Sequence, residues 1–204
     1  MLGPHEVAAF ERCIREGGVA IFPADTVYGL ACAPDSAGAI ARMYALKGRA
    51  PTTPSAVMFF RLDDAFEALG DVGRATSDAL ARLLPGPVTA VLPNPAKLFP
   101  LASAGGTLGI RVPALAGELA PLAAVRVPVL QTSANPTGGP DARSLDDVAS
   151  EIRAGVDVAL DAGPRSGTPS TVIDLSGYER GGSWRVLREG ALGDAKVRDL
   201  LRPA

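Results

Sequence analysis

Residues 19–30 read VAIFPADTVYGL, an apolar run followed at once by a polar segment. The run at 19–22 predicts a buried strand, because successive apolar side chains leave no polar face along it. The segment at 23–30 begins where this predicted strand gives way to a loop. This polar segment, directly after the first predicted strand, strengthens a functional interpretation of two polar clusters elsewhere in the chain.

Hydrophobic periodicity continues this pattern as alternating helices and strands. Val7, Phe10 and Ile14 recur at helical spacing, and a second helix is expected after the possible caps Asp35 and Ser36. Further helices are expected at 76–84, 115–125, 144–152 and 194–200. Further strands are expected at 56–60, 88–92, 108–112, 127–131, 156–160, 171–175 and 184–187.

Several of these strands follow one another with only loops between them. The sequence therefore predicts an α/β fold of α+β-like character, built on a mixed sheet rather than an all-parallel one. No repeat, charge block or low-complexity linker interrupts the sequence, so we expect a single domain over residues 1–204.

The two polar clusters lie where predicted elements end. Lys47 and Arg49 stand at the end of the second helix, and Ser133 and Asn135 follow the strand predicted at 127–131. Brought together, they would form an anion site, with both cations free to reach a ligand. Taken separately, the cations also suit the negative end of a helix dipole, and Ser and Asn suit an ordinary turn.

The motifs of this sequence, taken in order along the chain, resemble those of a known family. Residues 23–30 follow a signature of the form P-T-[DE]-T-x-Y-G-L at every position except 24, and K-x-R and S-x-N follow at 47–49 and 133–135. Later blocks are PGPVT at 85–89, GIRVP at 109–113, PSTVI at 169–173 and VLREG at 186–190. From about residue 17 to residue 190 the chain resembles the YrdC/TsaC family of threonylcarbamoyl-AMP synthases.

The resemblance implies a twisted, open mixed sheet with flanking helices and a concave, positively lined groove. It implies a nucleotidyltransferase that uses ATP and Mg²⁺ to condense L-threonine and bicarbonate into threonylcarbamoyl-AMP, with release of pyrophosphate. The product would pass to a tRNA threonylcarbamoyl transferase for the threonylcarbamoyladenosine modification of tRNA. The resemblance also implies the short form of the family, without the extra C-terminal domain of longer relatives.

The resemblance assigns the site residues, with catalytic roles for Lys47 and Arg49. Arg143 matches none of the blocks and is included because it follows the loop at 133–135. Arg111 also suits the exposed polar face of a strand. No protein-held metal is expected. The expected ATP contacts are Lys47, Arg49, Ser133, Asn135, Arg143 and Arg188. The expected threonine contacts are Thr26, Tyr28, Arg111 and Ser170.

One position departs from the signature, since Ala24 stands where the family usually carries threonine. An alanine offers no hydroxyl to a substrate, which leaves open a paralogous carbamoyl-adenylate enzyme with another substrate. An RNA-binding or ribosome-associated module of the same fold is a third hypothesis.

The composition of the chain argues against several functional classes. The 204 residues carry a net charge of −2 and a pI near 5.5, which argues against a protein that coats nucleic acid. His5 is the only histidine, which disfavours a Ser-His-Asp unit or a histidine-rich metal site, and no P-loop motif occurs. Cys13 and Cys32 lack the spacing of a redox pair. With no signal peptide or membrane-spanning run in the sequence, we expect a cytoplasmic protein.

Overall fold

The structure, a computed structural model, describes residues 2–50 and 54–202. Nine strands of these residues form one sheet, in the order β7-β1-β2-β6-β3-β5-β4-β8-β9. Three pairs are parallel (β1 with β7, β3 with β5, β4 with β8) and the other five are antiparallel, so the predicted mixed sheet is confirmed. The strands are β1 Val19–Pro23, β2 Tyr28–Cys32, β3 Ala56–Met58, β4 Val88–Pro93, β5 Thr107–Arg111, β6 Val129–Ser133, β7 Val158–Ala159, β8 Thr171–Gly177 and β9 Ser183–Arg188.

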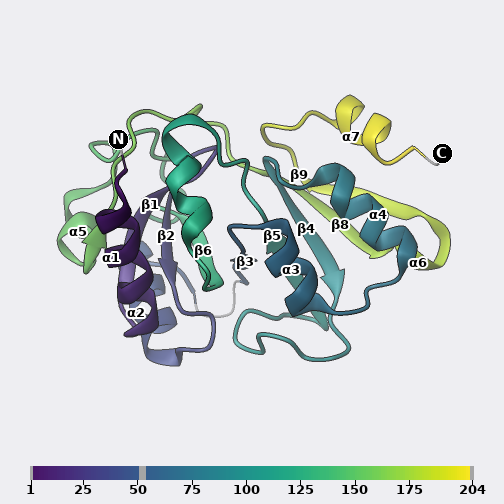
Figure 1. The fold of residues 1–204 in the computed structure, drawn as a ribbon, viewed down its shortest axis with the longest axis horizontal. Coiled ribbons are helices and arrows are strands. Elements are labelled where there is room, and N and C mark those ends of the chain that lie inside the picture. The colour runs from purple at the N-terminus through teal and green to yellow at the C-terminus, as the bar shows by residue number, and fades with distance from the viewer. Residues whose placement is uncertain (1, 51–53, 203–204) are drawn as a thin grey trace.

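Helices gather around both ends of this sheet (Figure 1). Helices α1, α2 and α5 lie near β1 and β2, whereas α4, α6 and α7 lie near β4, β8 and β9. No helix in the described part of the chain is long and apolar enough to cross a membrane. The helices are α1 Pro4–Arg15, α2 Ala37–Lys47, α3 Leu62–Leu69, α4 Arg74–Leu83, the 3₁₀ helix η1 Gly117–Ala124, α5 Ser150–Ala154, α6 Tyr178–Gly181 and α7 Asp194–Leu200.

The structure corrects several predicted elements. Strand β2 and helix α3 were not predicted; β2 is a fully buried partner of β1, joined to it by the short turn at 24–27. The helix expected at 115–125 is a 3₁₀ helix that contains Pro121, which cannot donate a helical hydrogen bond. The helix expected at 144–152 begins only at Ser150, because the Asp147 carboxylate accepts the N–H groups of residues 143 and 144 in a local turn.

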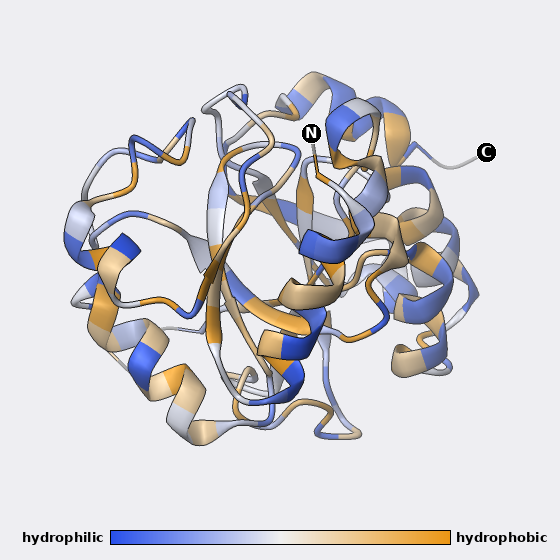
Figure 2. Ribbon diagram, turned by 60° about the vertical axis from the view of Figure 1, so that its left-hand side comes forward, coloured by the Kyte–Doolittle hydropathy of each residue, from blue (hydrophilic) through white to orange (hydrophobic). Residues whose placement is uncertain are grey.

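Successive residues of the strands face two separate cores, as the pleat of a strand requires. In β1, Val19 and Ile21 pack in one core with residues of α2 and α4, whereas Ala20 and Phe22 pack in the other with residues of α1 and η1. Figure 2 shows apolar residues along the central strands and a mixture of polar and apolar residues on the surrounding helices.

The second face of the sheet is only partly covered by α1 and η1. Val129 of β6 packs in their core, but Gln131, two residues on and on the same face, does not. Thr89 of β4 and Arg111 of β5 lie on this face too, because Val88, Ala90 and Ile110 pack in the opposite core. A helix packs on a sheet through large apolar side chains, and this part of the face carries polar ones instead. It lines a pocket.

Helix α4 is capped from a distant part of the chain. Its N-cap residue, Gly73, has no side-chain oxygen, and the Glu179 carboxylate of α6 accepts hydrogen bonds from the Thr76 N–H at 2.8 Å and its hydroxyl at 3.0 Å. A Cβ added at Gly73 would lie 2.1 Å from the Glu179 carboxyl carbon, so only glycine lets this carboxylate approach.

We expect Glu179→Ala to lower the free energy of unfolding by about 1–2 kcal/mol, because the first turn of α4 loses its acceptor. Urea denaturation followed by circular dichroism measures the change. The matched control is Glu67→Ala, at an exposed position of α3, which should change stability by less than about 0.5 kcal/mol. Equal stability of the two variants would contradict the capping role.

Candidate active site

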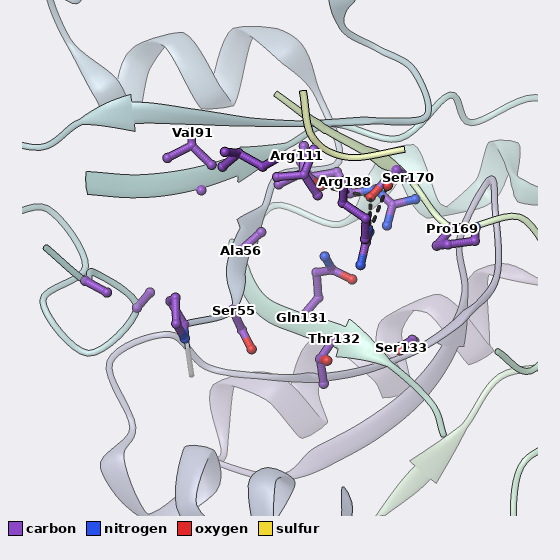
Figure 3. A pocket seen from close by; sticks show the side chains of 18 of the residues that line it. Ser55, Ala56, Val91, Arg111, Gln131, Thr132, Ser133, Pro169, Ser170 and Arg188 are labelled. Carbon is purple, nitrogen blue, oxygen red and sulfur yellow. Dashed lines mark hydrogen bonds between the residues drawn. The ribbon is translucent and has the colours of Figure 1, made fainter. Parts of the chain in front are cut away.

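The open part of the sheet face holds a pocket of about 320 Å³. Its lining includes Gly29, Ala56 and Gly109, and because glycine has no side chain and alanine only a methyl group, the sheet surface stays accessible there. In Figure 3 the labelled Arg111, Arg188 and Ser170 lie on one side of the pocket, with Ser55 and Thr132 on the other. The polar lining includes Arg49, Arg111, Gln131, Ser133, Ser170 and Arg188.

Three guanidinium groups from separate elements line this pocket. Arg49 follows α2, Arg111 ends β5 and Arg188 ends β9. Partial burial lowers the pKa of Arg188; the charge of Asp141 opposes this, and those of Arg111 and Arg49 lower the pKa further. Because the three cations lie close enough to influence one another, the pocket suits an anionic ligand.

Arg111 is held rigidly by the turn at 24–27. Its Nη2 donates to Asp25 Oδ1 and Thr26 Oγ1, both at 2.6 Å, and Asp25 Oδ2 accepts the N–H of Ala114 at 3.0 Å. The Arg111 and Asp25 side chains are only 4% and 8% exposed. Among the described residues, the buried Nε of Arg111 has no hydrogen-bond partner. Both contacts to the turn use Nη2, so Arg111 is oriented in advance while its Nη1 keeps its donors for a ligand.

Arg188 and Arg49 are positioned by short-range contacts. Arg188 Nη2 donates to the Ser170 carbonyl at 2.8 Å, and Ser170 Oγ lies 3.0 Å from Thr89 Oγ1. Arg49 donates to Thr132 Oγ1 at 2.8 Å, and its guanidinium carbon lies 5.5 Å from the centre of the Tyr44 ring. Both side chains are thereby oriented toward the pocket that they line.

The local sequence explains why the side chains of Lys47 and Arg49 point in different directions. Helix α2 begins at its cap Ser36, as predicted, and ends at Lys47. Gly48 follows with a φ of 59°, and the N–H groups of Gly48 and Arg49 bond to the carbonyls of Ala45 and Tyr44. This Schellman motif, which favours glycine, turns Arg49 away from the helix, so the two cations take different directions.

The two predicted polar clusters lie together, but Lys47 is engaged. Lys47 is only 4% exposed, and its ammonium donates to the Ser133 carbonyl, to the Asn135 carbonyl at 2.5 Å and to Asn135 Oδ1 at 3.1 Å. The expectation that both cations are free is therefore wrong for Lys47, because the carbonyl oxygens of the loop satisfy its ammonium. Burial lowers the pKa of Lys47 to about 8; the charge of Arg49 adds to this and that of Asp141 opposes it.

Asn135 has a structural contact as well. Its Oδ1 accepts the Ser133 hydroxyl at 2.5 Å, and its Nδ2 donates to the Gly139 carbonyl at 2.6 Å. Ser133 lines the pocket, whereas Asn135 supports the loop from behind. The predicted pair thus divides into one residue at the pocket and one that fixes its position.

Other predicted site residues lie away from the pocket lining. Tyr28 is fully buried and its hydroxyl donates to Asp161 Oδ1 at 2.6 Å; burial and this hydrogen bond raise the pKa of Tyr28 to about 12. Thr26 reaches the site only through Arg111. Arg143 is exposed and lies against Gly167. Ala24 is 2% exposed within the core of α1 and η1, so a side chain at this position faces apolar neighbours.

Sequence reasoning missed several polar lining residues, among them Thr89, Gln131 and Thr132. Each lies within or at the end of an apolar run that was assigned to a strand. Gln131 carries a usable signal, because a single amide in the run VPVLQTS predicts either an exposed position or a ligand contact.

A mixed sheet with three arginines converging on one pocket defines an α/β protein suited to an anionic ligand. A family model named Sua5_yciO_yrdC and described as telomere recombination matches residues 12–190. The chain therefore belongs to the Sua5/YciO/YrdC family.

Relatives and solved structures agree with this assignment. Threonylcarbamoyl-AMP synthase of Pyrococcus abyssi is 31% identical over 166 residues, covering 80% of this chain and 48% of that protein. The protein of the same name from Hahella chejuensis is 32% identical over 166 residues, covering 80% and 90%. The structure of P. abyssi Sua5 complexed with L-threonine is 26% identical, with a TM-score of 0.84, and the match covers 98% of this chain and 58% of that one. The chain thus spans about half the length of the P. abyssi and Bacillus subtilis relatives.

The contact between Lys47 and Asn135 can be measured by a double-mutant cycle. We expect Lys47→Met and Asn135→Ala each to weaken ATP binding, and the double variant to lose less than the sum by about 0.5–3 kcal/mol, since both residues hold one loop. Isothermal titration with ATP gives the four affinities. The control cycle pairs Lys47→Met with Glu179→Ala, at the opposite end of the sheet (Figure 1), and should be additive. Additivity in both cycles would contradict a shared loop.

Because the pKa of Lys47 is lowered to about 8, we expect affinity for an anionic nucleotide such as ATP to depend on pH. Its ammonium form donates three protons to the three acceptors at 133–135, whereas the neutral amine has two protons and no charge. We expect ATP affinity to fall as pH rises through about 8. In Lys47→Met this step should be absent and affinity should already be low. A parent protein whose affinity is level from pH 7.5 to about 9, above the final ionisation of ATP, would contradict the assignment.

Proposed function

We propose that this chain is a threonylcarbamoyl-AMP synthase. It would condense L-threonine, bicarbonate and ATP to threonylcarbamoyl-AMP and pyrophosphate, for the threonylcarbamoyladenosine modification of tRNA. The observation that carries the proposal is the convergence of Arg49, Arg111 and Arg188 on one pocket. It is supported by relatives that bear this name and by the similarity to P. abyssi Sua5, which was solved with L-threonine.

The reaction suits a pocket of this composition. The threonine amine and bicarbonate form an N-carboxylated threonine with loss of water, and its new carboxylate attacks the α-phosphorus of ATP. The bond from this phosphorus to the bridging oxygen breaks, and pyrophosphate leaves with the electron pair. No protein nucleophile is needed, so the residues act by positioning anions and neutralising charge.

Each pocket residue then has a role that follows from its contacts. Arg49 and Arg188 bind phosphate oxygens, and Arg111 binds the threonine carboxylate with the donors that Asp25 and Thr26 leave available. Ser133 and Ser170 offer hydroxyls to the substrates. Lys47 and Asn135 serve the nucleotide by holding the loop that presents Ser133. Tyr28 supports the site from within the sheet, and Arg143 would reach the phosphates only if its loop moved.

Mg²⁺ is part of the proposal as a companion of ATP. Among the described residues, no group of three or more His, Cys, Asp or Glu side chains is arranged to hold a metal ion. Mg²⁺ commonly keeps several waters and binds substrate phosphates together with one or two carboxylates. The triphosphate would therefore bring most of its ligands, and the ion would neutralise part of the charge on the leaving pyrophosphate.

The proposed product is an activated mixed anhydride that needs an acyl acceptor, and we propose that a tRNA-specific transferase consumes it. We propose cytoplasmic action on that basis. Direct contact with tRNA is not required for the adenylation step, and the acidic pI of about 5.5 favours small-molecule substrates over RNA as the primary ligand.

We expect ATP-dependent pyrophosphate release to need both L-threonine and bicarbonate. Omitting either should reduce the rate at least about tenfold, because the attacking carboxylate forms only from the two together. A coupled pyrophosphate assay measures the rate, and mass spectrometry identifies the adenylate. Equal release in the absence of either substrate would refute the proposed function, and salt-sensitive RNA binding without turnover would favour the RNA-binding module.

A further inference from the structure

The chain's only glutamine lies in the pocket, and its side chain has no hydrogen-bond partner among the described residues. Gln131, in β6, is 8% exposed, and Figure 3 shows its side chain reaching into the pocket with no hydrogen bond to the other residues drawn. The two other buried amides of the described residues are bonded, Asn94 to the Leu98 backbone and Asn135 to the Gly139 carbonyl. The amide of Gln131 opens into the pocket and makes no hydrogen bond to the described residues, so it is available to a ligand.

The residues beside Gln131 leave room for a small group. Gln131 pairs with Ala56 of β3, and a Cβ added at Gly109 of β5 would lie 3.4 Å from the Ala56 Cβ. Strand β3 lies between β6 and β5, so Ala56 and Gly109 form the floor between the side chains of Gln131 and Arg111. The pocket thus places an uncharged amide and a guanidinium on either side of a flat, apolar floor.

The two polar side chains recognise different chemistry. Arg111 offers only donors and a positive charge, which suits a carboxylate. The carboxamide of Gln131 offers a donor and an acceptor without charge, which suits a hydroxyl, because a hydroxyl also donates and accepts. A small molecule that carries both a carboxylate and a nearby hydroxyl satisfies both side chains at once.

We propose that Gln131 is a specificity-determining residue that binds the β-hydroxyl of the amino acid substrate while Arg111 binds its carboxylate. The inference rests on the proposed function, because it requires an amino acid in this pocket. The Gln131 Oε1 accepts the hydroxyl proton and its Nε2 donates to the hydroxyl oxygen. L-Threonine satisfies the amide, whereas L-valine, with a methyl group in place of the hydroxyl, leaves it buried and unpaired.

The test compares L-threonine with L-valine in the pyrophosphate assay, for the parent and for Gln131→Met, which keeps the length of the side chain but removes the amide. We expect the parent to prefer threonine by at least about 100-fold, since a site that binds a substrate hydroxyl strongly rejects an analogue without it. In Gln131→Met the ratio of kcat/KM values for the two amino acids should fall at least about tenfold. The KM for ATP should not change.

Gln131→Ala is the second variant, and thermal melting shows that both variants are folded. Glu179→Ala, which is destabilised outside the pocket, should keep the parent's ratio and so controls for a general loss of stability. An unchanged ratio in both Gln131 variants overturns the inference. A raised KM for ATP with an unchanged ratio also overturns it, because the amide would then contact the nucleotide.

Failure of the proposed function gives a different result. If the parent releases no pyrophosphate with any amino acid, the synthase assignment fails, whatever the Gln131 variants do. Calorimetric titration with L-threonine and L-valine, without ATP, then measures the selectivity of the pocket directly. Threonine binding that is lost in Gln131→Met supports the inference, and binding that is equal in parent and variant overturns it.

Discussion

The buried ammonium of Lys47 is the contact on which the arrangement of the site depends. It joins the end of α2 to the loop after β6, across 86 to 88 positions of sequence, and its three acceptors belong to Ser133 and Asn135. Burying a cation is costly unless it is hydrogen-bonded, and here every ammonium proton has an acceptor. The same contact fixes where Ser133 enters the pocket and where the chain turns at Gly48 to present Arg49. Lys47 therefore acts on the site through the backbone that it holds.

The second constraint is the division of one sheet face into a covered part and an open part. Phe22 and Val129 pack beneath α1 and η1, whereas Gln131 and Arg111 lie where none of the described helices covers the sheet. A strand that carries Val129 and Gln131 on one face serves both parts, because its pleat continues unchanged from core to pocket. The pocket side chains therefore stand on a strand that is fixed in the core. An anion site needs such support if its donors are to be oriented before a ligand binds.

Periodicity and local chemistry predicted most of this framework, and the failures have identifiable causes. The strand at 19–22 and the helix that ends at Lys47 follow from local patterns, and the structure contains both. Strand β2 was missed because its residues were interpreted as a loop signature, although all five are buried. The engagement of Lys47 depends on loop carbonyls more than 80 positions away, and no spacing encodes such a contact. Gln131 looks like part of a strand until the open half of the sheet face is known.

The charge of the pocket explains how an acidic chain can suit several anions. The net charge of −2 determines the electric field far from the protein, and salt screens this field within about 8–10 Å. A ligand in the pocket instead lies close to Arg49, Arg111 and Arg188. These cations repel one another, and the charges of Arg111 and Arg49 lower the pKa of Arg188 as a result. Asp25 neutralises part of this charge, but it is bound to one side of Arg111 and to the Ala114 N–H, so it does not occupy the pocket. An anion placed among the three guanidinium groups therefore gains its own attraction and also relieves their mutual repulsion. A neutral ligand gains neither, so the arginines select for charge and leave the choice among similarly charged substrates to uncharged groups such as Gln131.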